Sequence, residues 1–290
     1  MIIIIVHYLV MIVITSIVIF SATLPIFATN EAPLSYWKFN GNLEDSGSLN
    51  VKLLNTYPIY TCNNYVMTFC FDSHDPLLGK INFTSTQFNK GIHFNGKSYL
   101  TSGFENESKY DFLNSKHQFT IETWITPSRL CIAETCYHHY FISKTQSFPP
   151  TKMSFGNVQG FACGIQRDGS FYCYFKNPYE YLHIETLINY ADDLPKHLTI
   201  VHNGEGTYNG FSFYVNGELV KKKDSDYYDI QTLRLEHQTV NNQPLVLGNY
   251  WIRNINPLTN STLDDLKIYD YARTTEQIEF DYDNDINKLK

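Results

Sequence analysis

Short turn dipeptides divide the chain into brief segments, and they constrain the fold more than any other feature of the sequence. Asn-Gly and Asp-Gly pairs between apolar stretches favour the tight turns of β-hairpins. Long stretches with the spacing of an amphipathic helix are missing, whereas Tyr (22) and Phe (20) are abundant in the 290 residues. The sequence therefore predicts an all-β protein. The turn pairs are Asn40-Gly41, Asn95-Gly96, Asp168-Gly169, Asn203-Gly204, Asn209-Gly210 and Asn216-Gly217.

A strand with a two-residue period is predicted near the end of the chain, over 263–271. In a regular strand, Leu263 and Asp265 share one face, and Asp264 and Leu266 share the other. Strand stability does not require the two adjacent carboxylates, because Asp is depleted in strands. We expect this segment to pair beside the first strand of the chain and to close a two-layered β-sandwich.

Neighbouring apolar segments predict hairpins at 91–101, 159–176 and 197–216. They belong to about a dozen short strands without an internal repeat, which is typical of a sandwich. Only 274–278 predicts a helix, the start of one short one.

The chain carries, in this order, the segments Trp37–Asp45, Lys90–Gly96, Phe119–Trp124, Ile142–Lys144, Lys196–Val201, Phe213–Gly217, Leu245–Gly248, Leu263–Tyr269 and Glu276–Ile278. This ordered set resembles the laminin-G-like jelly roll of the concanavalin A-like lectin/glucanase superfamily and spans about residues 33–280. The resemblance implies a two-sheet antiparallel jelly-roll sandwich. Its members are typically secreted or cell-surface binding modules, and many bind calcium or glycans. Cysteine-bearing insertions at 55–88 and 128–138 depart from the pattern, as does Lys196, where many relatives carry Trp.

The N-terminal segment has the pattern of an export signal. Residues 2–20 are almost wholly apolar, and the segment Ser21–Ala28 follows, with cleavage expected after Ala28. No Lys or Arg precedes the apolar stretch, whose length approaches the roughly 20 residues that span a bilayer. An uncleaved membrane anchor is therefore the alternative. We expect a signal peptide or signal anchor at 1–28, the jelly-roll domain at 29–282 and a polar C-terminal tail at 283–290.

Six cysteines behind an export signal indicate disulfide bonds and a secreted or cell-surface protein, extracellular or lumenal. A three-residue turn ending at Gly169 places Cys163 directly opposite Cys173, whereas a two-residue turn would put the sulfurs on opposite faces. We expect the bond from Cys163 to Cys173. Nearest-neighbour bonds are expected for the remaining cysteines, Cys62 with Cys70 and Cys131 with Cys136.

Three Asn-x-Ser/Thr triplets also fit an exported surface, since they are acceptors for N-glycosylation. They begin at Asn82, Asn106 and Asn260.

The charge of the chain argues against nucleic acid and anionic lipid as partners. The formal net charge is -7, and no basic stripe is present. The one basic cluster, Lys221–Lys223, is expected on a solvated edge strand, where Lys discourages pairing between sheets. Contact with a membrane is expected only through residues 2–20, if they are not removed.

A structural calcium ion is the one cofactor that the resemblance suggests. If the first and last strands are neighbours, loop 42–47 approaches Asp264, and Asp45 with Asp264 matches the position where relatives often hold calcium through oxygen ligands. The alternative is that Asp45 caps a turn while Asp264 bonds local backbone. A second acidic cluster, 281–285, lacks the Gly of a calcium-binding loop and is expected to be a solvated tail.

No catalytic motif is present, so no catalytic residue is predicted. The Glu-x-Asp-x-x-Glu pattern of glucanases with this fold and the Gly-x-Ser-x-Gly elbow are both missing. His197 and His202 lie five residues apart on one expected strand and so face opposite sides, which argues against zinc.

We therefore expect an exported, non-enzymatic binding or adhesion module that recognises a glycan or an extracellular protein through loops of the jelly roll. No ligand-binding residue is singled out by the sequence. The alternatives are a divergent glycoside hydrolase-like enzyme and a structural, membrane-anchored surface or coat component.

Overall fold

The computed structural model describes residues 31–56, 60–62, 70–72, 81–96, 98–114, 117–129, 138–147, 158–176, 181–205, 208–224, 242–249 and 257–290. The predicted signal or anchor segment at 1–28 lies outside these ranges, as do Cys131 and Cys136. Within the described ranges, no helix combines the length and apolar character needed to cross a membrane.

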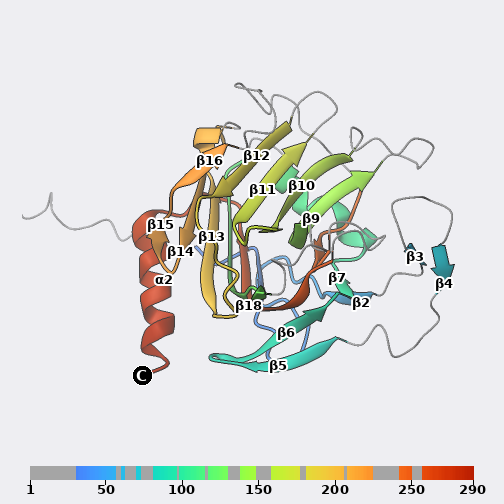
Figure 1. Ribbon diagram of the computed structural model, residues 1–290, viewed down its shortest axis with the longest axis horizontal. Helices are drawn as coiled ribbons and strands as arrows, with labels where there is room; N and C mark the ends of the chain where they lie inside the picture. The colour runs from blue at the N-terminus through green and yellow to red at the C-terminus, as the bar shows by residue number, and fades with distance from the viewer. Residues whose placement is uncertain are drawn as a thin grey trace, which may run out of the picture. The chain divides into compact units, whose positions relative to one another are not determined.

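Two antiparallel sheets form the domain, so the all-β jelly-roll sandwich expected from the sequence is confirmed (Figure 1). Sheet A has the order β15 (Glu218–Leu219), β14 (Phe211–Val215), β13 (Lys196–His202), β8 (Phe119–Thr126), β18 (Thr259–Tyr269), β6 (Asn89–Asn95), β5 (Asn82–Thr86), with β1 (Ser35–Trp37) also paired to β18. Sheet B has the order β16 (Lys222–Asp224), β12 (Tyr181–Thr186), β11 (Phe171–Lys176), β10 (Val158–Gln166), β9 (His138–Ser147), β17 (Val246–Leu247), β7 (Tyr99–Thr101), β2 (Leu54–Thr56).

In the described part of the chain, four elements besides the C-terminal helix lie outside the two sheets. The strands β3 (Tyr60–Cys62) and β4 (Cys70–Asp72) form a separate pair, in which Cys62 lies opposite Cys70 in register. The 3-10 helices are η1 (Phe104–Asn114) and η4 (Tyr208–Gly210). The bond between Cys62 and Cys70 stays a prediction.

The last strand lies beside the first, as expected. Tyr36 is opposite Lys267 and Trp37 is opposite Leu266 in the antiparallel ladder of β1 and β18. Trp37 and Ile268 are fully buried in the same hydrophobic core, and the indole of Trp37 donates to the carbonyl oxygen of Val51 at 2.8 Å. The two chain ends of the domain are therefore joined through one core.

The β10–β11 hairpin has the predicted register. Gln166 and Ser170 close the turn through a backbone hydrogen bond of 2.9 Å, and Gly169 takes a φ of +83°. Cys163 and Cys173 are directly paired and joined by a disulfide bond whose half-cystines are fully buried between the sheets. The disulfide expected from the turn length is thus present.

The expected hairpin over 91–101 is wrong. Strand β6 pairs with β5 and β18 in sheet A, whereas β7 pairs with β17 and β2 in sheet B. The chain therefore crosses between the layers near Asn95-Gly96, a turn pair that the local pattern alone assigned to a hairpin.

Strand β18 is not regular, and this overturns the predicted alternation of its faces. Its register against β8 shifts between Asp264 and Lys267, and Asp265 takes a φ of +47°. Because of this bulge, Leu263 and Leu266 both enter the core, although a regular strand would place them on opposite faces.

The C-terminal helix α2 (Thr275–Asn287) is longer than the short helix expected. Thr274 and Gln277 form a reciprocal capping box at its start, and Ile278 packs with Val201 and Tyr214 on the outer side of sheet A (Figure 1). The expected boundary between domain and polar tail, at residue 282, falls inside this helix. Asp285 is 8% exposed and not part of a solvated tail.

Candidate functional site

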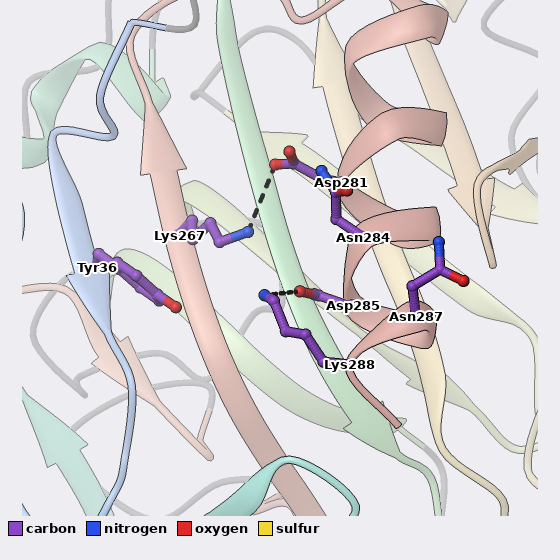
Figure 2. A pocket seen from close by; sticks show the side chains of 7 residues that line it. All are labelled: Tyr36, Lys267, Asp281, Asn284, Asp285, Asn287 and Lys288. Carbon is purple, nitrogen blue, oxygen red and sulfur yellow. Dashed lines mark hydrogen bonds and ion pairs between the residues drawn. The ribbon is translucent and has the colours of Figure 1, made fainter. Parts of the chain in front are cut away.

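A polar pocket of about 450 Å³ lies on the outer side of sheet A, where β1 and β18 face α2 (Figure 2). The strands supply one aromatic ring and one ammonium group, and the helix supplies carboxylates, amides and a second ammonium group. The lining residues are Tyr36, Lys267, Asp281, Asn284, Asp285, Asn287 and Lys288.

The helical wall follows from the spacing of polar residues in α2. Asp281, Asn284, Asp285 and Lys288 recur at intervals of three and four, which places them on one face of a helix. The neighbouring face carries Tyr282, whose ring centroid lies 6.0 Å from that of Trp124. The helix therefore rests on the sheet by one face and presents polar groups to the pocket with the next.

The strand wall follows from the pairing of β1 with β18. Tyr36 and Lys267 lie directly opposite each other, and the Lys267 ammonium is 5.7 Å from the centroid of the Tyr36 ring. The Tyr36 hydroxyl donates to Asp265 Oδ1 at 2.7 Å, which fixes the ring at the pocket wall. An antiparallel register between residues far apart in sequence thus builds this side of the site.

A buried charge network lies beneath the pocket. The fully buried Glu122 of β8 accepts from Lys267 at 2.6 Å and from Arg273, and His197 Nε2 lies 3.4 Å from Glu122 Oε1. Burial alone would raise the pKa of Glu122, but Lys267, His197 and Arg273 hold it well below its ordinary value. The Glu122 carboxylate is therefore ionised, and the neighbouring cationic side chains balance its charge.

The same network holds the helical wall in place. Arg273 donates to Asp281 at 2.7 Å and to the Gln277 carbonyl oxygen at 3.1 Å, and Lys267 lies 3.5 Å from Asp281. These contacts join Glu122 on β8 to α2 through two cations. The distance between helix and sheet, and hence the width of the pocket, depends on them.

The carboxyl group of Asp285 lines the other end of the pocket, and it interacts electrostatically with Asp264 and Asp265 of β18. Asp285 Oδ2 accepts from the Trp124 indole at 3.1 Å, and Asp264 Oδ2 accepts from the Thr86 hydroxyl at 2.6 Å. Burial, together with the charges of Asp265 and Asp285, raises the pKa of Asp264 from 3.8 to about 7. Burial also raises the pKa of Asp265, and Asp285 adds to that rise. Because Leu263 and Leu266 on either side of them both enter the core, the expectation that Asp264 and Asp265 point to opposite faces of a regular strand does not hold.

The long side chain of Lys288 completes this end of the pocket. The Lys288 ammonium donates to Asp285 Oδ1 at 2.7 Å while 69% of the Lys288 side chain is exposed. Figure 2 shows this lysine reaching from the end of α2 to the carboxylate at the pocket wall. The ion pair is therefore open to solvent on its cationic side only, since the Asp285 side chain is 12% exposed.

The carboxylates expected to bind calcium have other partners. Asp45 Oδ1 accepts from the backbone N–H groups of Tyr36 and Gly47, both at 2.7 Å, and its Oδ2 accepts from that of Val51 at 2.9 Å. Asp264 Oδ1 accepts from the Asp265 N–H. Among the described residues, no three His, Cys, Asp or Glu side chains are arranged to hold a metal ion. A calcium ion at Asp45 and Asp264 stays a prediction, and it would have to compete with these hydrogen bonds.

The predicted glycosylation acceptors differ in exposure. Asn82 on β5 and Asn260 on β18 are exposed. Asn106 is partly buried in η1, and its side-chain amide donates to the Ser102 carbonyl oxygen at 2.7 Å. The first two are therefore better placed for modification than the third.

His197 and His202 face opposite sides of β13, as expected. On the side of sheet A that faces α2, the ring centroids of His197 and Trp124 lie 5.1 Å apart. On the side that faces the core, His202 stacks on Phe211 with ring centroids 4.2 Å apart. The two rings do not form a common metal site.

Most pocket residues were not singled out from the sequence. The helical spacing of Asp281, Asn284, Asp285 and Lys288 is a usable signal, but the acidic pattern at 281–285 taken alone predicts a solvated tail. Tyr36 carries no signal of its own, because its role depends on the pairing of β1 with β18.

A family model described as the concanavalin A-like lectin/glucanases superfamily matches residues 94–279. No curated protein sequence matches the chain significantly.

Several solved structures share the fold at low sequence identity. The binding domain of Paraclostridial Mosquitocidal Protein 1 is 16% identical, with a TM-score of 0.56 over 88% of this chain and 53% of that one. The binding domain of botulinum neurotoxin serotype D is 14% identical, with a TM-score of 0.53 over 88% and 51%. Domain 4 of AbnA, a GH43 extracellular arabinanase from Geobacillus stearothermophilus in complex with arabinotriose, is 18% identical, with a TM-score of 0.54 over 86% and 98%.

The extent of these matches differs. The chain spans about half the length of the toxin binding domains, but almost the whole length of the arabinanase domain. The toxin chains are binding domains, and the arabinanase domain is in complex with arabinotriose. At these identities the likeness establishes the fold.

Proposed function

We propose, on the premise that this chain belongs to the concanavalin A-like lectin/glucanase superfamily, that it is a non-enzymatic binding module whose pocket between β1, β18 and α2 binds a glycan. The observation that carries the proposal is the pocket itself. Its single aromatic ring, Tyr36, stands among amide, carboxylate and ammonium groups. Ligand sites combine a concave wall with a few convergent polar groups, and such groups suit the hydroxyls and ring faces of sugars.

The volume and the chemical mixture agree with this ligand class. About 450 Å³ falls within the roughly 300–1,000 Å³ of small-molecule sites. Asn284 and Asn287 are exposed at the rim and each offers a donor and an acceptor. The fold neighbour crystallised with arabinotriose adds support at the level of the fold.

Binding is favoured over glycoside hydrolysis by the pairing of the pocket carboxylates. A glycosidase needs two carboxyl groups flanking the bond to be cut, one of which delivers a proton. Here Asp281 is paired with Arg273 and Lys267, and Asp285 is paired with Lys288. Asp281 is thus engaged in holding the helix, and Asp285 accepts from the Trp124 indole as well as from Lys288.

We also propose that the module acts outside the cell that makes it. The apolar segment at 2–20 and the six cysteines support export, and the exposure of Asn82 and Asn260 supports glycosylation at these two positions. N-terminal sequencing of the exported protein should begin at Thr29, whereas recovery of Met1 in membranes would favour the anchor.

A glycan array tests the proposed function. The full chain is compared with a double variant, Asn284→Ala with Asn287→Ala, and with Asn242→Ala, an exposed Asn that precedes β17 in the other sheet. The double variant should lose the signals of the wild type, and the control should keep them. If the double variant keeps the glycan signals, the binding site lies elsewhere on the protein. If a bound glycan is cleaved, the protein is an enzyme and not a binding module.

A further inference from the structure

We propose that the pocket recognises its glycan through a free primary ammonium group, which takes the place of the Lys288 ammonium on the Asp285 carboxylate. The ligand class is an amino sugar whose nitrogen carries no acetyl group. This inference rests on the proposed function, because it assigns a narrower ligand to the same pocket.

The first support is the arrangement of charge around Asp285. Asp264, Asp265 and Asp285 act on one another electrostatically, and their side-chain donors are the hydroxyls of Thr86 and Tyr36, the Trp124 indole and the Lys288 ammonium. Among these donors only Lys288 carries a charge. Lys267 acts on Asp265 through space while it is bound to Glu122 and Asp281. Among the described donors to these three carboxyl groups, the one directly bound cation is thus Lys288, and it binds Asp285.

The second support is that an ammonium group already occupies the site. Lys288 Nζ lies 2.7 Å from Asp285 Oδ1, although 69% of its side chain is exposed. Exposed ion pairs contribute little to stability because a long side chain must be ordered in solvent. When the lysine turns away, Asp285 Oδ2 keeps its hydrogen bond from the Trp124 indole at 3.1 Å, and Asp285 Oδ1 becomes available to another cation. Lys288 is therefore a replaceable occupant, and an incoming ammonium finds a site of fitting geometry.

The remaining lining selects a sugar over a bare amine. The amides of Asn284 and Asn287 stand on the same wall as Asp285, and the Tyr36 ring lies on the opposite wall (Figure 2). These groups offer donors, acceptors and an apolar face at positions around the bound ammonium. A hexosamine unit presents hydroxyls to the amides and its C–H face to the ring.

Titration calorimetry on the full chain tests the inference with two probes, the β-1,4-linked dimer of glucosamine and its N,N′-diacetylated form. The wild type should bind the amine form roughly tenfold more tightly or better, because one charge-assisted hydrogen bond distinguishes the two. Lys288→Met should tighten binding of the amine form by roughly threefold or more, since the competing ammonium is gone. Asp285→Asn should abolish the preference for the amine.

Lys52→Met is the matched control. Lys52 is also an exposed lysine, 62% by side chain, in an ion pair with Glu44 at 2.6 Å, and its removal changes the net charge by the same amount. The control should bind both probes as the wild type does. Because Asp285→Asn alters a buried residue, a Tm and a near-UV spectrum accompany it. If it fails to fold, the exposed Lys288→Met variant decides the result.

The outcomes separate this inference from the proposed function. Equal affinity for the two probes, with Lys288→Met unchanged, would overturn the ammonium site, while loss of binding in the Asn284/Asn287 double variant would keep the pocket as a glycan site. If the array shows no glycan that depends on the pocket, the proposed function fails. If Nα-acetyl-lysine methylamide binds as tightly as the amine dimer, the occupant is a protein side chain and the sugar assignment is wrong.

Discussion

The two faces of strand β8 in sheet A are both buried but are built from different chemistry. Toward sheet B, strand β8 contributes Ile121 and Ile125 to the continuous hydrophobic core. Toward α2, the same strand contributes Glu122 and Trp124, at 0% and 5% exposure. The inner face is stabilised by removing apolar surface from water, whereas the outer face depends on compensation of charge. Only the outer face borders the polar pocket, so a binding site can be altered there without changing the core.

The largest expected effect tests whether the outer face depends on its charge network. Glu122→Ala leaves Lys267 and Arg273 without their buried carboxylate and should cost about 3–5 kcal/mol of unfolding free energy. Urea denaturation near neutral pH measures the loss. The isosteric Glu122→Gln, which keeps the volume, should also be strongly destabilised. A loss below about 1 kcal/mol in both would mean that water screens the network.

The inner face should respond to volume and not to charge. Ile121→Ala removes buried methyl groups from a core side chain that is 1% exposed, and it should cost about 2–4 kcal/mol. High salt should leave this loss unchanged, because no charge is involved. A loss that changes with salt to the same degree as that of Glu122→Ala would remove the distinction between the two faces.

A smaller effect concerns the pH dependence of the outer face. The folded state raises the pKa of Asp264 from 3.8 to about 7, chiefly through burial. The folded protein therefore binds this proton more tightly than the unfolded chain does. The stabilisation is fully present below 3.8 and is lost as the pH rises to about 7.

The substitution Asp264→Asn should remove this loss of stability with rising pH. Relative to the wild type, the variant should gain about 1–3 kcal/mol between acidic and mildly alkaline pH. About three pKa units at roughly 1.4 kcal/mol each set an upper bound of about 4 kcal/mol, and screening by solvent reduces it. Thermal denaturation across the range measures the difference, with the exposed Asp270→Asn as the control. A constant difference at all pH values would contradict the role given to Asp264.

The smallest expected effect is that of Lys288→Met on stability. The ammonium side of its ion pair with Asp285 is exposed, so the free energy of unfolding should change by less than about 0.5 kcal/mol. Urea denaturation of the variant beside Lys52→Met gives the comparison. A loss near that of Ile121→Ala would make Lys288 a structural residue and not a replaceable occupant of the pocket.

Features set by local geometry were predictable from the sequence. The turn ending at Gly169 determines the β10–β11 register and hence the pairing of Cys163 with Cys173. Thr274 and Gln277 mark the start of α2 through a capping box. The ordered segments also identified the jelly roll, because their succession constrains which strands are neighbours.

Features that depend on contacts between distant parts of the chain were not predictable from the sequence. The Asn95-Gly96 turn leads to a change of sheet, which depends on β17 and β2 pairing with β7. The bulge after Asp264 breaks the two-residue period that the sequence pattern suggests. The pocket joins Tyr36 to helix residues near the opposite end of the chain, and neither part carries a ligand motif alone.

A crystal structure of the full chain with the amine dimer tests the central claim most directly. We expect the sugar to lie between Tyr36 and α2, with its nitrogen at hydrogen-bond distance from Asp285 and with Lys288 turned away into solvent. An ordered sugar on another surface, such as the outer side of sheet B beside Tyr172 and Tyr174, with Lys288 still bound to Asp285, would contradict it.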